Sequence, residues 1–141
     1  MRRIAVTTEI AAPAEAVWAQ LTDTESFPAW NPFIQSLSGT VAVGARLEAC
    51  IAPPNGRPMT FRPTVTVVEE GRRLEWLGRL LLPGVFDGRH SFTLEPFAGG
   101  TRLTQAETFT GILVPLLGST LTKTEEGFRQ MNEALRARAV A

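Results

Sequence analysis

The chain has 141 residues and carries 14 basic and 14 acidic side chains, so its formal net charge is zero. This length predicts one domain over residues 1–141, able to bury enough surface to fold without a disulfide or a metal, and the balanced charge argues against a nucleic-acid partner. A single cysteine, Cys50, excludes an internal disulfide, and no apolar run is long enough to cross a bilayer, so we expect a cytoplasmic protein without stable membrane insertion.

The first part of the chain predicts a strand followed by two helices. Residues 4–10 alternate between apolar and polar side chains, as in a half-buried strand. A proline then precedes residues 14–21, whose apolar side chains recur at helical spacing. Thr22 and Glu25 have the spacing of a capping box and predict a second short helix. This helix must end by residues 30–32, because an asparagine before a proline disfavours helical backbone.

Residues 33–110 predict six strands joined by short turns. Pairs of glycine, proline and asparagine residues mark the turns. The region contains no helix-length connection of the kind that parallel strands need, so the strands should form an antiparallel meander. The expected strands span residues 33–41, 45–52, 58–68, 73–80, 85–95 and 101–110.

The last part of the chain changes to a helical period. From Val114 onward, apolar side chains form one stripe and charged side chains fill the other positions, as in a long amphipathic helix. Gly127 lies inside this helix at a cost of roughly 1 kcal/mol relative to alanine, which indicates a close approach to the sheet or a curve over it. The sequence therefore predicts an α+β fold in which a curved antiparallel sheet of about seven strands wraps around this helix.

Four segments resemble a known superfamily. Residues 11–18, with the sequence Ala-Ala-Pro-Ala-Glu-Ala-Val-Trp, resemble the start of the first helix in bacterial polyketide cyclase or dehydratase-like proteins. Residues 27–33, Phe-Pro-Ala-Trp-Asn-Pro-Phe, resemble the beginning of their second strand, and residues 86–92 and 100–111 resemble their last two strands. These proteins share the helix-grip fold with START lipid-transfer domains and Bet v 1 allergens, in the SRPBCC superfamily. The resemblance implies this fold around an internal cavity and a hydrophobic ligand or substrate.

The alternation along the last two strands brings a histidine and a glutamate together. If residues 97–100 form the hairpin turn, Pro96 opposes Thr101 and His90 opposes Glu107 on the inward face, with Cβ atoms about 5 Å apart. The pair is suited to bind a ligand oxygen or to move a proton in an aldol-type cyclisation or dehydration. Alternatively, the two side chains satisfy each other and only stiffen the sheet.

The same alternation predicts an apolar lining for the cavity. Aromatic side chains with a few polar groups are typical of binding pockets, although each side chain taken alone is equally typical of a core. The side chains expected to line it are Trp30, Phe33, Phe61, Trp76, Phe86, Phe92, Gln105, Phe109, Phe128 and Met131. We expect no cofactor and no metal, because the sequence shows neither a ligand cluster nor a phosphate-binding loop.

The outward faces of the strands and two apolar loops also carry features that predict a role. Strand arginines such as Arg89 fall opposite carboxylates such as Glu75 and predict ordinary surface pairs, each worth little. Residues 80–85 and 112–117 form apolar loops, which are candidates for a gate at the cavity entrance or for a protein contact. A monomer or a weak homodimer is expected.

Three functions fit these features. The first is a binding protein for a small hydrophobic molecule, such as a lipid, a polyketide or an aromatic metabolite. The second is a cyclase- or dehydratase-type enzyme that uses His90 and Glu107 as acid and base. The third is a protein-interaction module of the chaperone-activator kind, acting through the two apolar loops.

Overall fold

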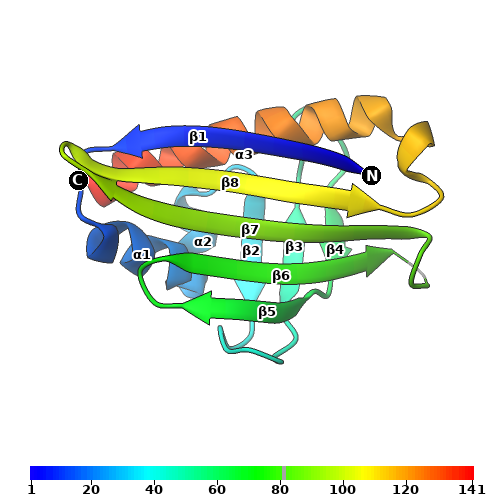
Figure 1. The fold of residues 1–141 in the computed structure, drawn as a ribbon, viewed down its shortest axis with the longest axis horizontal. Helices are drawn as coiled ribbons and strands as arrows, with labels where there is room; N and C mark the ends of the chain where they lie inside the picture. Colours follow the sequence, from blue (N-terminus) through cyan, green and yellow to red (C-terminus); the bar gives the residue numbers. More distant parts are fainter. Residues whose placement is uncertain (81) are drawn as a thin grey trace.

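Within residues 1–80 and 82–141, which the computed structural model describes, eight strands form two antiparallel sheets, and one long helix lies against them (Figure 1). The elements are β1 (Arg2–Ile10), α1 (Ala14–Thr22), a 3-10 helix (Thr24–Ser26), α2 (Phe27–Trp30), β2 (Ile34–Ser38), β3 (Glu48–Ile51), β4 (Met59–Phe61), β5 (Thr64–Glu69), β6 (Arg73–Leu80), β7 (Phe86–Phe97), β8 (Gly100–Thr110), a second 3-10 helix (Val114–Leu116) and α3 (Gly118–Ala139). The α+β class and the curved antiparallel arrangement are confirmed.

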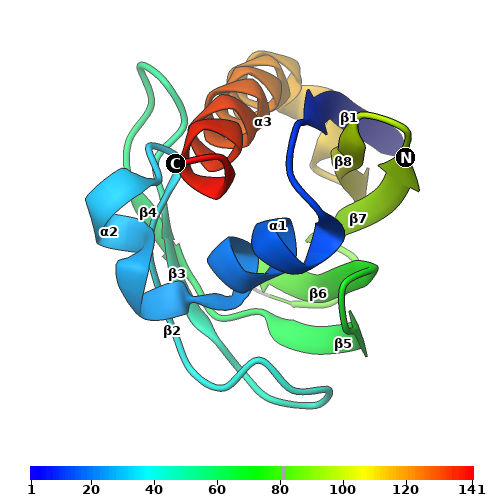
Figure 2. The same cartoon turned by 90° about the vertical axis from the view of Figure 1, so that its left-hand side faces the viewer.

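The two sheets share one hydrophobic core. The larger sheet has the strand order β1-β8-β7-β6-β5 and the smaller has the order β2-β3-β4. A single bridge between Arg46 and Thr64 joins the segment before β3 to β5. The view in Figure 2 shows the sheets curving around a common interior, with α3 closing one side. Buried side chains from both sheets, α1 and α3 form one continuous cluster in this interior.

Three local predictions differ from the structure. The strand expected over residues 58–68 is divided into β4 and β5, because Pro63 has no N–H to donate to a ladder and its carbonyl instead accepts from the backbone N–H of Leu47 (2.8 Å). The capping box at Thr22 does not form, since its hydroxyl donates back to the carbonyl of Trp18 (2.8 Å). The helix α3 begins at Gly118 rather than at Val114.

A close contact between α3 and the start of β2 explains the glycine inside the helix. Gly127 is buried, and a Cβ atom added there would collide with the ring of Phe33. The same ring meets Phe128 edge to face, with centroids 5.5 Å apart. The expectation that the helix makes a close approach at Gly127 is therefore confirmed.

The outer face of the larger sheet holds a buried carboxylate. Glu75 is only 6% exposed, although it lies on the outward side of β6. It accepts hydrogen bonds from Thr66 (2.7 Å), Arg73 (2.8 Å) and Arg89 (3.0 Å). Burial by itself raises the pKa of Glu75, but these hydrogen bonds and the charge of Arg89 outweigh it and hold the pKa below the usual 4.5. The sequence predicts only an ordinary surface pair for Glu75. In the structure, the long side chains of Arg73 and Arg89 cover this shorter acid.

Candidate functional site

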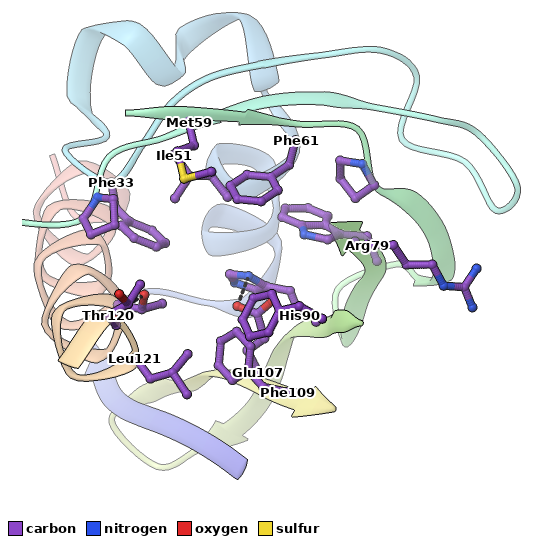
Figure 3. A pocket seen from close by; sticks show the side chains of 17 residues that line it. Phe33, Ile51, Met59, Phe61, Arg79, His90, Glu107, Phe109, Thr120 and Leu121 are labelled. Atoms are coloured by element: carbon purple, nitrogen blue, oxygen red, sulfur yellow. Dashed lines mark hydrogen bonds and ion pairs between the residues drawn. The ribbon is translucent and has the colours of Figure 1, made fainter. Parts of the chain in front are cut away.

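A cavity of about 120 Å³ lies between β4, the ends of β6, β7 and β8, and the first turns of α3 (Figure 3). Its base is formed by buried side chains, and its rim by exposed ones such as Met59 and Thr120. Arg79 also belongs to the rim, and Figure 3 shows its guanidinium pointing away from the interior. The lining consists of Phe33, Ile51, Pro53, Met59, Phe61, Pro63, Trp76, Gly78, Arg79, Phe86, Gly88, His90, Glu107, Phe109, Thr120, Leu121 and Thr124.

Two ionisable side chains meet at the base of this cavity. His90 opposes Glu107 in the β7–β8 ladder, in the register that the sequence predicts, and its Nδ1 lies 3.4 Å from Glu107 Oε1. The histidine side chain is 2% exposed, whereas the glutamate side chain retains 16% exposure. Glu107 is therefore the ionisable group at this base that a bound molecule reaches most easily.

One glycine of a cross-strand pair makes room for the glutamate. Gly78 of β6 and Gly88 of β7 are paired in the ladder, and both line the cavity. A Cβ atom at Gly88 would collide with Glu107 Oε2, while one at Gly78 would have its nearest neighbour, Pro63, at 3.9 Å. The carboxylate thus occupies the space that a side chain at Gly88 would fill.

A chain of buried amides holds the histidine from the other side. His90 Nε2 lies 2.9 Å from Gln105 Oε1, and Gln105 Nε2 donates to Asn132 Oδ1 (2.8 Å) on α3. Gln105 Nε2 also lies 3.5 Å from the carbonyl oxygen of Phe128, and Asn132 Nδ2 donates to the carbonyl of Val6 on β1 (3.1 Å). Asn132 Nδ2 also donates to the hydroxyl of Thr8 (3.2 Å). Because both amides have no exposed surface, their orientation is set by these buried partners.

Three aromatic rings surround the imidazole. The ring centroids of Phe92 and Phe128 each lie 4.9 Å from that of His90, and the centroid of Trp76 lies 5.2 Å away. These rings exclude water from the histidine on the sides that face neither Gln105 nor Glu107. In such surroundings a hydrogen bond is stronger than in water, and an unpaired polar atom is more costly.

The residues expected at the site fall into three groups. Those that line the cavity are Phe33, Phe61, Trp76, Phe86, His90, Glu107 and Phe109. Those that lie fully buried behind the lining are Phe92, Gln105, Phe128 and Met131. Trp30 lies outside it, because its indole packs edge to face on Phe27 at 5.2 Å and donates to the hydroxyl of Ser26 (3.2 Å).

Several lining residues were not expected from the sequence. Gly88 has no side chain to signal a role, and Met59 lies on a short strand within a segment expected to be one longer strand. Two polar residues share the apolar stripe of α3 with Phe128: Thr124, which lines the cavity, and Asn132, which lies buried behind the lining and bonds to Gln105. A polar side chain on an otherwise apolar helix face was the available signal for both of them.

The two apolar loops lie next to each other at one end of the larger sheet. The backbone N–H of Ile112 donates to the carbonyl of Gly84 (3.1 Å), and Leu82 and Leu116 are exposed nearby in sequence. Leu81 and the side chain of Leu80 lie outside the described residues. None of the described residues at 82–85 or 112–117 lines the cavity.

Residues 1–80 and 82–141 contain neither a cluster of metal-ligating side chains nor a helix that could span a membrane. No group of three or more histidine, cysteine, aspartate or glutamate side chains among these residues is arranged to hold a metal ion. No helix in this part of the chain is both long and apolar enough to cross a membrane.

Comparison with known families identifies the chain. The family described as polyketide cyclase / dehydrase and lipid transport matches residues 1–140. The chain belongs to this family. No curated protein matches the sequence.

Solved structures show that this member of the polyketide cyclase / dehydrase and lipid transport family has the helix-grip fold. A protein from Mesorhizobium loti is 24% identical with a TM-score of 0.78, and the match covers 97% of this chain and 96% of that one. A START superfamily protein from Mycobacterium smegmatis is 21% identical with a TM-score of 0.74, again over 97% and 96% of the two chains. A protein of the dynemicin biosynthetic locus is 24% identical with a TM-score of 0.72, but this match covers 96% of the present chain and 46% of the other. The expected resemblance to START and Bet v 1-like proteins is confirmed at the level of the fold.

Proposed function

We propose that this protein binds a small apolar molecule, about the size of one aromatic ring, in the cavity beside His90 and Glu107. The observation that carries the proposal is a cavity of about 120 Å³ with a mostly aromatic and aliphatic lining and one ionisable pair at its base. An engineered protein cavity of about 150 Å³ accommodates benzene, so one ring is the matching size. A larger polyketide or lipid would require the half-buried rim, including Phe61 and Phe86, to move outward.

The size of the ligand sets the expected affinity. One aromatic ring buries about 150–250 Å², which at about 25 cal/mol per Å² stabilises the complex by roughly 4–6 kcal/mol before the cost of association. Because the cost of association reduces this gain, the Kd of an unsubstituted ring should be no tighter than about 0.04 mM. Millimolar probe concentrations and a method suited to weak binding are needed.

Toluene titration followed by NMR tests the proposal. The indole N–H resonance of Trp76, which lines the cavity, should shift as toluene is added. Thr124→Phe should weaken or abolish the shift, because Thr124 lines the cavity. Thr122→Phe is the matched control: both threonines lie on α3 and donate to the carbonyl four residues earlier, but Thr122 is not part of the lining. Equal binding by the two variants, or no shift in the wild-type protein, would contradict the proposal.

A second candidate function is acid–base catalysis at the same site. It is favoured by the partly exposed carboxylate of Glu107 in contact with His90, since a carboxylate beside an apolar pocket is a suitable base for a carbon next to a carbonyl group. Acetophenone is a probe of the right class, and exchange of its methyl hydrogens for deuterium is followed by NMR in D₂O. Catalysis predicts exchange above the buffer rate that Glu107→Gln removes and that Glu133→Gln, on the exposed side of α3, leaves unchanged. If the wild-type protein exchanges these hydrogens only at the buffer rate, the catalytic proposal is refuted and the binding proposal stands.

A further inference from the structure

The buried amides of Gln105 and Asn132 have only one possible orientation. Asn132 faces the carbonyl oxygen of Val6, and Gln105 faces the carbonyl oxygen of Phe128. A carbonyl oxygen can only accept, so each amide must turn its NH₂ group toward its carbonyl. The oxygen of Asn132 is then free to accept from Gln105 Nε2 at 2.8 Å, and the oxygen of Gln105 points toward the histidine.

This orientation determines the proton position on His90. Its Nε2 lies 2.9 Å from Gln105 Oε1, an amide oxygen that only accepts, so Nε2 must carry a hydrogen. The other ring nitrogen, Nδ1, faces Glu107 Oε1 at 3.4 Å. A hydrogen bond between these two atoms requires one further proton, either on Nδ1 or on Oε1, because two opposed lone pairs repel each other.

In both positions of that proton, the same oxygen of Glu107 remains available to a ligand in the cavity. Whether His90 is an imidazolium beside a carboxylate or a neutral ring beside a carboxylic acid, Glu107 Oε2 carries no proton. Oε2 lies over Gly88, on the inward face of β7 and beside the cavity. The pair has no net charge in either form, and its free atom is a hydrogen-bond acceptor.

We propose that Gln105 and Asn132 are positioning residues that hold the proton of His90 on Nε2, and that Glu107 Oε2 consequently selects ligands that donate a hydrogen bond. The preferred ligand class is a neutral one-ring molecule with a hydroxyl group, such as a phenol, over an ether or a hydrocarbon of the same size. This selectivity rests on the proposed binding function, whereas the proton position on His90 does not.

The proton position can be measured directly because His90 is the only histidine in the chain. Nitrogen-15 NMR of the imidazole should show a protonated Nε2 in the wild-type protein. In Gln105→Met, which is similar in size but has no amide, the form protonated only on Nδ1 should appear, with Glu107 as its acceptor. Thr104→Val, a change on the outward face of the same strand, should leave the spectrum as in the wild type. A bare Nε2 in the wild-type protein, or an unchanged spectrum in Gln105→Met, would overturn the positioning role.

The ligand preference is tested with phenol, anisole and toluene as probes. Relative to toluene, phenol should bind about tenfold more weakly to Glu107→Met than to the wild-type protein, the loss expected for one charge-assisted hydrogen bond. Glu107→Gln should retain the preference for phenol over anisole, because its NH₂ group donates to His90 Nδ1 and leaves the amide oxygen facing the cavity. A preference for anisole in Glu107→Gln would mean that the amide is reversed and that the inferred proton position is wrong.

The two proposals fail in distinguishable ways. If neither phenol nor toluene binds the wild-type protein, the binding function and the donor preference both fall, while the imidazole spectrum still decides the proton position. If both probes bind and Glu107→Met leaves their ratio unchanged, the binding function stands and the donor preference is refuted.

Discussion

Replacing Gly127 by alanine tests how closely α3 approaches the start of β2. Alanine should gain roughly 1 kcal/mol from helix propensity. Against this, three ring atoms of Phe33 lie within 3.1 Å of the new Cβ position, where carbon contacts are normally about 3.5–4.0 Å. Overpacking of this kind costs roughly 1–3 kcal/mol, and the edge of Phe128 limits the retreat of the ring. We expect a net destabilisation of up to about 2 kcal/mol, which lowers Tm by up to roughly 10 °C.

Gly118→Ala is the matched control in the same helix. A Cβ at Gly118 has Arg2 Nη1 as its neighbour at 3.6 Å, an ordinary contact. This variant should be as stable as the wild-type protein, or more stable by up to about 1 kcal/mol. Thermal unfolding followed by circular dichroism gives both values, and urea unfolding gives the free energies. If Gly127→Ala matches Gly118→Ala in stability, the argument from close packing against Phe33 is refuted.

Three further predictions concern the glycine pair, the buried acid and the buried amide. Gly88→Ala should be less stable than Gly78→Ala by about 1–3 kcal/mol in urea unfolding, because only the former displaces Glu107; equal values would contradict the role of Gly88. The folded-state pKa of Glu75 is lowered, so its contribution to stability is present above pH 4.5 and is lost as the pH falls through the folded-state value. Unfolding free energies measured from pH 7 to 3 should therefore fall less steeply in Glu75→Gln than in the wild type, and parallel curves would count against this linkage. Asn132→Leu should lose about 1–3 kcal/mol with an unchanged m-value, because it removes the nearest acceptor of Gln105 Nε2 and the side-chain donor to the carbonyl of Val6; a neutral effect would show that the amide chain adds no stability.

The part of the site that could be predicted is the part governed by local rules. A short hairpin turn determines the register of the two strands that follow it, and side chains alternate between faces. These two rules suffice to place His90 opposite Glu107. The long helix and the aromatic character of the interior follow in the same way from periodicity.

The rest of the site depends on contacts between segments that are distant in the sequence. Trp30 and Phe33 are both aromatic and three positions apart, but only Phe33 lines the cavity, because the indole of Trp30 packs on Phe27. The role of Gln105 as a support for the histidine requires knowing that Asn132 of α3 lies against β8. Neither contact has a local signature, so neither could be derived from spacing alone.

The pairing of β1 with β8 has a consequence for folding during synthesis. The two strands are antiparallel neighbours in which Ile4 faces Glu107. Therefore β1 cannot pair until a segment about 100 positions later has been synthesised. The helix that covers them, α3, emerges later still. A ribosome-bound chain that ends before residue 100 therefore holds an unpaired apolar strand at its start. We expect such chains to depend on chaperones and to become protease-resistant only after β8 and α3 have been synthesised.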